Sequence, residues 1–149
     1  DALPICESQV LVQPLGAEEL PNYSVISCEN TALQPGETSR ITKMVEKPDD
    51  TSGLDSNLAA VGRYVLSADI WPFLEKTEPG AWGRIQLTDA IDALKDHSPV
   101  NALALKGTAY NCGEKLGYMQ AYVSYGLRHD KQGEEFKQWL AEFKKQATA

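Results

Sequence analysis

The pattern of apolar and polar positions before residue 113 predicts a series of short strands. Runs rich in β-branched residues, partly alternating with polar residues, occupy 8–15, 22–30 and 39–48. Residues 58–67 are nearly all apolar, which is typical of a central strand covered on both faces. Another strand is predicted over 100–107, and residues 108–112 are a candidate partner strand for it.

Helical spacing predicts helices between and after these strands. Residues 67–77 begin with a candidate serine cap, and residues 86–97 carry Leu87, Ile91 and Leu94 at spacings of four and three. Two helices that close the chain each carry an apolar stripe, namely Leu116, Met119, Val123 and Leu127, then Phe136, Trp139, Leu140 and Phe143. We interpret both stripes as core or subunit packing. Strands mixed with helices over one sheet predict an α/β or α+β layer fold.

The composition narrows the classes of protein to consider. A chain of 149 residues is expected to form one domain, 1–149. It has no apolar run of the roughly twenty residues that a membrane span needs, so we expect a soluble protein. The net charge of −7 disfavours nucleic acid as a partner. The three cysteines, Cys6, Cys28 and Cys112, are far apart and lack zinc spacing, so we expect a reducing, cytoplasmic location.

Two candidate sites lie on the predicted strands. Glu46 and Lys47 precede a proline at a strand end, where the carboxylate can accept hydrogen bonds from hydroxyls and the ammonium can meet a phosphate. The alternative is a solvated pair of charges ahead of a proline stop. Gly62 interrupts a strand of bulky residues, which indicates either a close approach by backbone or ligand, or a β-bulge.

A third candidate lies at the junction that follows the last strands. Asn111 and Gly113 precede a predicted helix, whose first amides favour an anionic group. The alternative is that Asn111 caps the helix that starts near Glu114. Cys112 is interpreted as a small buried side chain and not as a nucleophile, because neither histidine is near it in sequence. Both histidines, His97 and His129, are expected at the surface.

Three longer motifs carry a resemblance to a known family. The segments "MVEKP", "NLAAVGRYVLSADIWPFLEKTEPGAWGRIQLTDAI" and "YNCGEKLGYMQAYVSYGLRH" resemble the C-terminal half of bacterial UTP–glucose-1-phosphate uridylyltransferase. The resemblance runs from about Ser8 to about Phe143. It implies the C-terminal half of a Rossmann-like α/β/α nucleotidyltransferase fold, with a mixed sheet and two C-terminal helices. It also implies synthesis of UDP-glucose and pyrophosphate from UTP and glucose 1-phosphate with Mg²⁺, a reaction of carbohydrate metabolism.

The resemblance assigns roles to particular residues. Glu46 would hold glucose hydroxyls, Lys47 would bind the sugar phosphate during catalysis, and Val61 and Gly62 would lie against the sugar. Ser24 stands where the family usually has the glycine of a Tyr-Gly-Val-Val strand, so a side chain is expected to intrude near the sugar.

A second departure concerns the metal. The residue before Cys-Gly is an aspartate that helps to hold Mg²⁺ in the active enzymes, and here it is Asn111, which offers one neutral oxygen. The stretches "YSVI" and "GAWGRIQLTDAI" are similar to a paralogous branch described as weakly active or regulatory, although that branch retains the aspartate.

The family's N-terminal, nucleotide-binding half is missing from these residues, and the chain begins at Asp1, so we expect a cut chain. Without that half, we expect the chain alone to be inactive and not to bind UTP properly. Two hypotheses follow. The chain is part of a uridylyltransferase and supplies the sugar-phosphate side of the site, or it is a non-catalytic regulatory or binding paralogue that associates with the active enzyme. Either way we expect association, as a homo-oligomer or with that paralogue, because a half-domain exposes sheet edges.

Overall fold

A computed structural model describes residues 7–50, 53–80 and 83–147 of the chain. Cys6 therefore lies outside the described residues, as do Ala81 and Trp82 of the second quoted motif. The chain divides into two compact units, Asp1–Gly107 and Thr108–Ala149.

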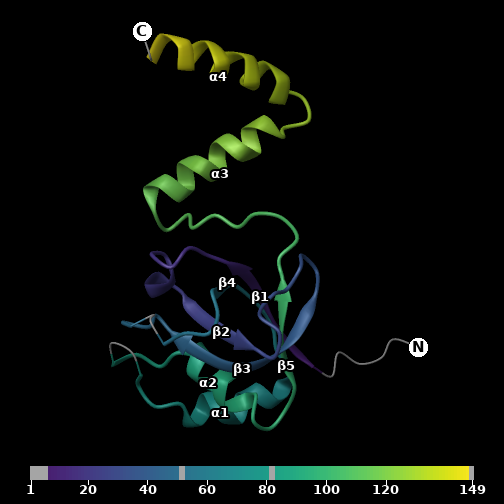
Figure 1. The fold of residues 1–149 in the computed structure, drawn as a ribbon, viewed down its shortest axis with the longest axis vertical. Coiled ribbons are helices and arrows are strands. Elements are labelled where there is room, and N and C mark those ends of the chain that lie inside the picture. Colours follow the sequence, from purple (N-terminus) through teal and green to yellow (C-terminus); the bar gives the residue numbers. More distant parts are fainter. Residues whose placement is uncertain (1–6, 51–52, 81–82, 148–149) are drawn as a thin grey trace, which may run out of the picture. The chain divides into compact units, whose positions relative to one another are not determined.

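The first unit is built on a closed barrel in which the strands follow the order β1-β4-β2-β3-β5 (Figure 1). The strands are β1 (Ser8–Pro14), β2 (Ser24–Cys28), β3 (Thr38–Glu46), β4 (Leu58–Val65) and β5 (Val100–Ala104). The pairing of β1 with β5 is parallel and the other pairings are antiparallel, which confirms the predicted mixed sheet. The prediction of a strand over 108–112 is wrong, because these residues lead into a turn and do not pair with β5.

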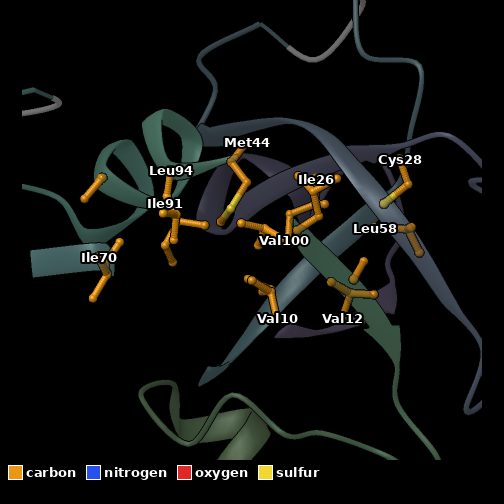
Figure 2. Packing of buried hydrophobic residues seen from close by; sticks show 14 residues of the cluster. Val10, Val12, Ile26, Cys28, Met44, Leu58, Ile70, Ile91, Leu94 and Val100 are labelled. Atoms are coloured by element: carbon orange, nitrogen blue, oxygen red, sulfur yellow. The ribbon is translucent and has the colours of Figure 1, made fainter. Parts of the chain in front are cut away.

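The core fills the barrel and continues under two helices. A short 3-10 turn, η2 (Ala68–Ile70), leads into α1 (Trp71–Lys76), and α2 (Leu87–Leu94) follows. Figure 1 shows α1 and α2 together on one side of the barrel, beside β3. Figure 2 shows the strand side chains Val10, Ile26 and Val100 gathered near Ile91 and Leu94 of α2, all of them fully buried.

The helix α2 differs in one position from its predicted apolar stripe. Ile91 and Leu94 are buried as predicted, but Leu87 is 37% exposed, and Thr88 is buried in its place. A polar side chain therefore faces the sheet at the first turn of this helix, and its hydroxyl needs a hydrogen-bond partner there.

Strand β4 contains an irregularity at Gly62. The register against β1 shifts between Val10 and Val12, which places three residues of β4, Val61 to Arg63, opposite a single residue of β1. Gly62 has a φ of 80°, a left-handed conformation that glycine adopts at little cost. The bulge interpretation of Gly62 is confirmed. Only the first three residues of the strand are buried, so coverage on both faces ends before the bulge.

The second unit consists of two helices, α3 (Lys115–Leu127) and α4 (Gly133–Ala147). A methyl group on Gly126 would lie 2.7 Å from the Phe136 ring, so the missing side chain lets the two helices pack closely. Leu116, Met119 and Trp139 are more than half exposed. The two predicted apolar stripes are therefore only partly packed in this unit. Among the described residues, no helix is both long enough and apolar enough to cross a membrane.

Candidate functional site

The predicted residue Glu46 ends β3, where it faces Ser24 of β2. The two residues are directly paired in the antiparallel ladder, and paired residues project their side chains on the same side of a sheet. The Ser24 hydroxyl donates a hydrogen bond to Oε2 of Glu46. The side chain expected to intrude at position 24 is thus bonded to the predicted sugar-binding carboxylate.

Thr88 contributes a second hydroxyl from α2. Its Oγ1 donates to the same Glu46 Oε2 at 2.7 Å, and it lies 3.2 Å from the Ser24 Oγ. Thr88 is 5% exposed, whereas Ser24 and Glu46 are half-buried. Two hydroxyls from different elements therefore converge on one carboxylate oxygen, and hydrogen bonds to an ionised acceptor are stronger than neutral ones.

Helix α2 is held along β3 by two further polar contacts. The Met44 amide donates to Oδ1 of Asp92 at 2.6 Å, and Arg40 Nη2 donates to the Lys95 carbonyl at 3.3 Å. Thr88 and Asp92 are four helical residues apart, a rise of about 6 Å, and their partners are two strand residues apart, about 6.6 Å. Helix and strand are thus in register, with opposite chain directions.

The carboxylate of Glu46 affects two neighbouring ionisable groups. Burial raises the pKa of Tyr64 above its ordinary value, and the negative charge of Glu46 adds to this effect. The pKa of Asp89 is also raised, first by burial and then by the charges of Glu46 and Asp92. Glu46 therefore lies in an acidic neighbourhood that is able to accept hydrogen bonds from a polyhydroxyl ligand.

Lys47 occupies a strained position directly after Glu46. Its φ is 42°, a left-handed value that costs a residue with a side chain roughly 1–2 kcal/mol. Its amide donates to the Tyr23 carbonyl at 3.1 Å, which continues the β2–β3 contact beyond the last strand residue. Pro48 is buried behind it. Strain of this kind is found more often at functional positions than elsewhere.

Gly62 lines a cavity of about 530 Å³ on the barrel. The other lining residues come from the neighbouring strands β1, β4 and β5 and are Gln9, Leu11, Arg63, Tyr64, Val65 and Leu103. The half-buried Val61 precedes Gly62 in the bulge. Tyr64, whose pKa is raised by burial and by the charge of Glu46, is one of the residues that line the cavity.

The remaining predicted residue, Asn111, belongs to the second unit. Its Oδ1 accepts a hydrogen bond from the Gly113 amide at 3.1 Å, and Glu114, at the N-cap of α3, forms no side-chain cap. The capping role suggested for Asn111 is therefore wrong, because Asn111 closes the turn that precedes the helix. The interpretation of Cys112 as buried is also wrong, since this turn leaves it exposed. Both histidines are exposed, as predicted.

The described residues do not form a magnesium site by themselves. Within 7–50, 53–80 and 83–147, no group of three or more histidine, cysteine or acidic side chains is placed to hold a metal. The Asn111 oxygen is neutral and already accepts a hydrogen bond, whereas Mg²⁺ favours anionic oxygen ligands.

Thr88 and Asp92 are the members of this arrangement that the sequence did not reveal. Their signal is present but weak: two polar residues one helical turn apart, next to the apolar positions of an amphipathic helix. Such residues belong to the solvated face unless a polar strand end lies opposite them, and the sequence does not show which strand the helix covers.

Comparisons with known proteins identify a family that this chain matches over most of its length. The sequence profile of the family described as Nucleotidyl transferase matches residues 7–139. A UTP–glucose-1-phosphate uridylyltransferase of Escherichia coli (strain K12) is 53% identical over 133 residues, which are 89% of this chain and 44% of that protein. The enzyme of the same name from Salmonella typhimurium (strain LT2) is 55% identical over 87% of this chain and 43% of its own length.

Solved structures give the same result. A UTP-bound UGPase from Acinetobacter baumannii is 39% identical with a TM-score of 0.79, over 91% of this chain and 45% of that one. A UDP-glucose pyrophosphorylase complexed with UDP-glucose is 37% identical with a TM-score of 0.73, over 82% and 45% of the respective chains. The chain thus spans less than half the length of these relatives.

Proposed function

The chain belongs to the nucleotidyl transferase family, and on that premise we propose that it is part of a UTP–glucose-1-phosphate uridylyltransferase. In this proposal the segment supplies the sugar-phosphate side of the active site. The observation that carries the proposal is the Glu46–Lys47 pair, which combines an anchored carboxylate with a cation on a strained backbone at one strand end.

The proposed reaction needs positioning more than covalent chemistry. An oxygen of the sugar phosphate attacks the α-phosphorus of UTP, the new P–O bond forms, and pyrophosphate leaves with the electrons of the bond that breaks. Glu46 would hold glucose hydroxyls, and the Lys47 ammonium would neutralise charge on the phosphate. Val61 and Gly62 would border the sugar beside the cavity on β4.

Magnesium is part of the proposal through position 111. An aspartate there would add an anionic ligand, which Asn111 does not provide. If the missing charge contributes about 3 kcal/mol to the transition state, turnover falls more than hundredfold. We therefore expect Asn111→Asp to raise the rate of UDP-glucose formation and to strengthen its dependence on Mg²⁺.

The experiment measures UDP-glucose formation by the protein expressed from its complete coding sequence. Lys47→Ala is expected to lower activity strongly, because it removes the phosphate-binding cation. Lys43→Ala is the matched control, since Lys43 is an exposed lysine of β3, the strand that ends just before Lys47, and should have no effect. No activity in the unmodified protein and in Asn111→Asp would exclude the catalytic proposal.

A second candidate function is a non-catalytic paralogue that associates with the active enzyme. Asn111 favours it, and so does the exposed apolar surface of α3, which includes Leu116, Met119 and Tyr122. Association is expected as a homo-oligomer or with the active enzyme, and co-purification tests the latter. A clean monomer by light scattering at high concentration, with no effect on the active enzyme, would exclude this function.

A further inference from the structure

We propose that Ser24 and Thr88 are positioning residues that hold one oxygen of Glu46, so that the other oxygen is presented to the hydroxyls of a hexose 1-phosphate. The inference rests on the proposed function, because it assigns the sugar contact to Glu46. It adds a specific device: the Ser24–Thr88 clamp, defined as the two hydroxyls that donate to Glu46 Oε2.

The clamp is built from rigid elements. Ser24 is paired directly with Glu46 in the β2–β3 ladder, so the strand register fixes the backbone positions from which the two side chains meet. Thr88 is 5% exposed, and its helix is held in register with β3 by the contact between Asp92 and the Met44 amide. Side chains mounted on such supports are more precise than side chains on loops.

The chemistry of the clamp determines which oxygen remains for a ligand. A carboxylate oxygen that accepts two hydroxyl donors has used its two main acceptor directions. With Oε2 occupied in this way, Oε1 is the oxygen that accepts hydrogen bonds from sugar hydroxyls. Fixing the rotamer before binding removes part of the entropy cost that an unrestrained glutamate side chain would incur on binding.

The clamp reverses the expectation for Ser24. If the side chain merely intruded on the sugar, removing its hydroxyl would strengthen binding. If the hydroxyl positions Glu46, removing it weakens binding. The two interpretations therefore predict opposite signs for a single substitution.

The experiment compares Ser24→Ala, Thr88→Val and Thr88→Ser in the protein expressed from its complete coding sequence. Calorimetry measures the Kd for glucose 1-phosphate, and kinetics separate KM from kcat. We expect Thr88→Val to raise Kd and KM about tenfold and Ser24→Ala about threefold, with kcat within about twofold, because the clamp acts on binding before and during the reaction. Thr88→Ser, which keeps the hydroxyl, should restore the Kd and KM of the unmodified protein.

Ser27→Ala is the matched control. Its hydroxyl donates to Asp55 Oδ1 at 2.5 Å, so the substitution removes the same kind of bond from the same strand without touching Glu46. Its Kd and KM should match the unmodified protein even where its stability falls. A rise in KM equal to that of Thr88→Val would overturn the inference, because the effect would then be structural.

A thermodynamic cycle keeps this test separate from the proposed function. The unfolding free energies of Glu46→Gln, Thr88→Val and the double variant should be non-additive if the clamp exists. Additive values, or binding unchanged or tighter in Ser24→Ala and Thr88→Val, would overturn the clamp while leaving the uridylyltransferase proposal intact. Failure of the unmodified protein to bind glucose 1-phosphate would overturn both proposals, even if the cycle showed coupling.

Discussion

Replacing Asp92 by alanine should loosen α2 from the barrel and disturb Glu46 from a distance. Asp92 Oδ1 accepts a hydrogen bond from the Met44 amide at 2.6 Å, and Met44 is only 5% exposed. Alanine leaves that amide without its acceptor in a place that water reaches poorly. The contact also maintains the register that brings Thr88 to Glu46, one helical turn away.

The expected loss can be worked out from the two contacts of Asp92. Leaving a buried donor unsatisfied costs about 1–3 kcal/mol. The ion pair between Asp92 and Lys95, at 3.7 Å and partly exposed, adds at most about 1 kcal/mol. We therefore expect Asp92→Ala to lower the free energy of unfolding by about 1–4 kcal/mol. Asp92→Asn, which keeps an acceptor oxygen, should lose less.

Asp96→Ala provides a matched control in the turn that follows the same helix. Asp96 pairs with the same Lys95 ammonium at 3.0 Å, but its side chain is 69% exposed and it contacts no strand amide among the hydrogen bonds of the described residues. Urea denaturation should show a loss of less than about 1 kcal/mol for this variant. Hydrogen exchange should show faster exchange of the Met44 amide in Asp92→Ala alone. Equal losses in both variants, with the Met44 amide still protected, would refute the docking role.

Three further predictions concern backbone strain, thiol chemistry and pH. Gly62→Ala should lower the free energy of unfolding by about 1–2 kcal/mol through its left-handed φ of 80°, as measured by urea denaturation; an unchanged midpoint would contradict this. Burial raises the pKa of Cys28 to about 11, so at about pH 8 roughly one molecule in a thousand is a thiolate. In a Cys6→Ser background, a thiol reagent should label the exposed Cys112 quickly and Cys28 only on unfolding; equal rates would contradict this. Because the pKa of Asp89 is raised in the folded state, folding favours the protonated acid. The resulting contribution to the free energy of unfolding is complete below the pKa that Asp89 has in the unfolded chain, and it is lost as the pH rises through the folded-state pKa. Asp89→Asn should therefore stabilise the protein more at about pH 7 than at about pH 4, and a gain independent of pH would contradict this.

Much of the fold of the first unit could be predicted because local pattern and tertiary structure agree there. Strand β1 alternates buried and partly buried residues, and the apolar start of β4 is buried as its composition indicated. The strand predicted over 108–112 failed because its few residues carry no alternation to outweigh the turn that Asn111 and Gly113 close. The closed barrel was not predictable, since closure depends on the pairing of β5 with both β1 and β3.

The candidate site was predictable in a different way. Glu46 and Lys47 came from a motif, and their spacing alone did not distinguish a ligand site from two solvated charges. Pairing of Ser24 with Glu46 follows from the β2–β3 register, which a sequence pattern does not specify. The contribution of Thr88 depends on which face of α2 meets β3, and a stripe of three apolar positions leaves that rotation uncertain by one residue, as the exposure of Leu87 demonstrates.

If the proposed function holds, the two departures from the family pattern should act on different kinetic constants. In the proposed arrangement the Ser24 hydroxyl strengthens the hold on the sugar, because it fixes Glu46 before the ligand arrives. Asn111 weakens the charge balance at the transferred phosphate, which matters mainly in the transition state. If the proposed function holds, the protein is expected to bind hexose 1-phosphate well and to turn it over slowly. Kinetics on Ser24→Ala and Asn111→Asp separate the two effects, since the first should change KM and the second kcat. A change of kcat in both variants would mean that the two substitutions do not act independently.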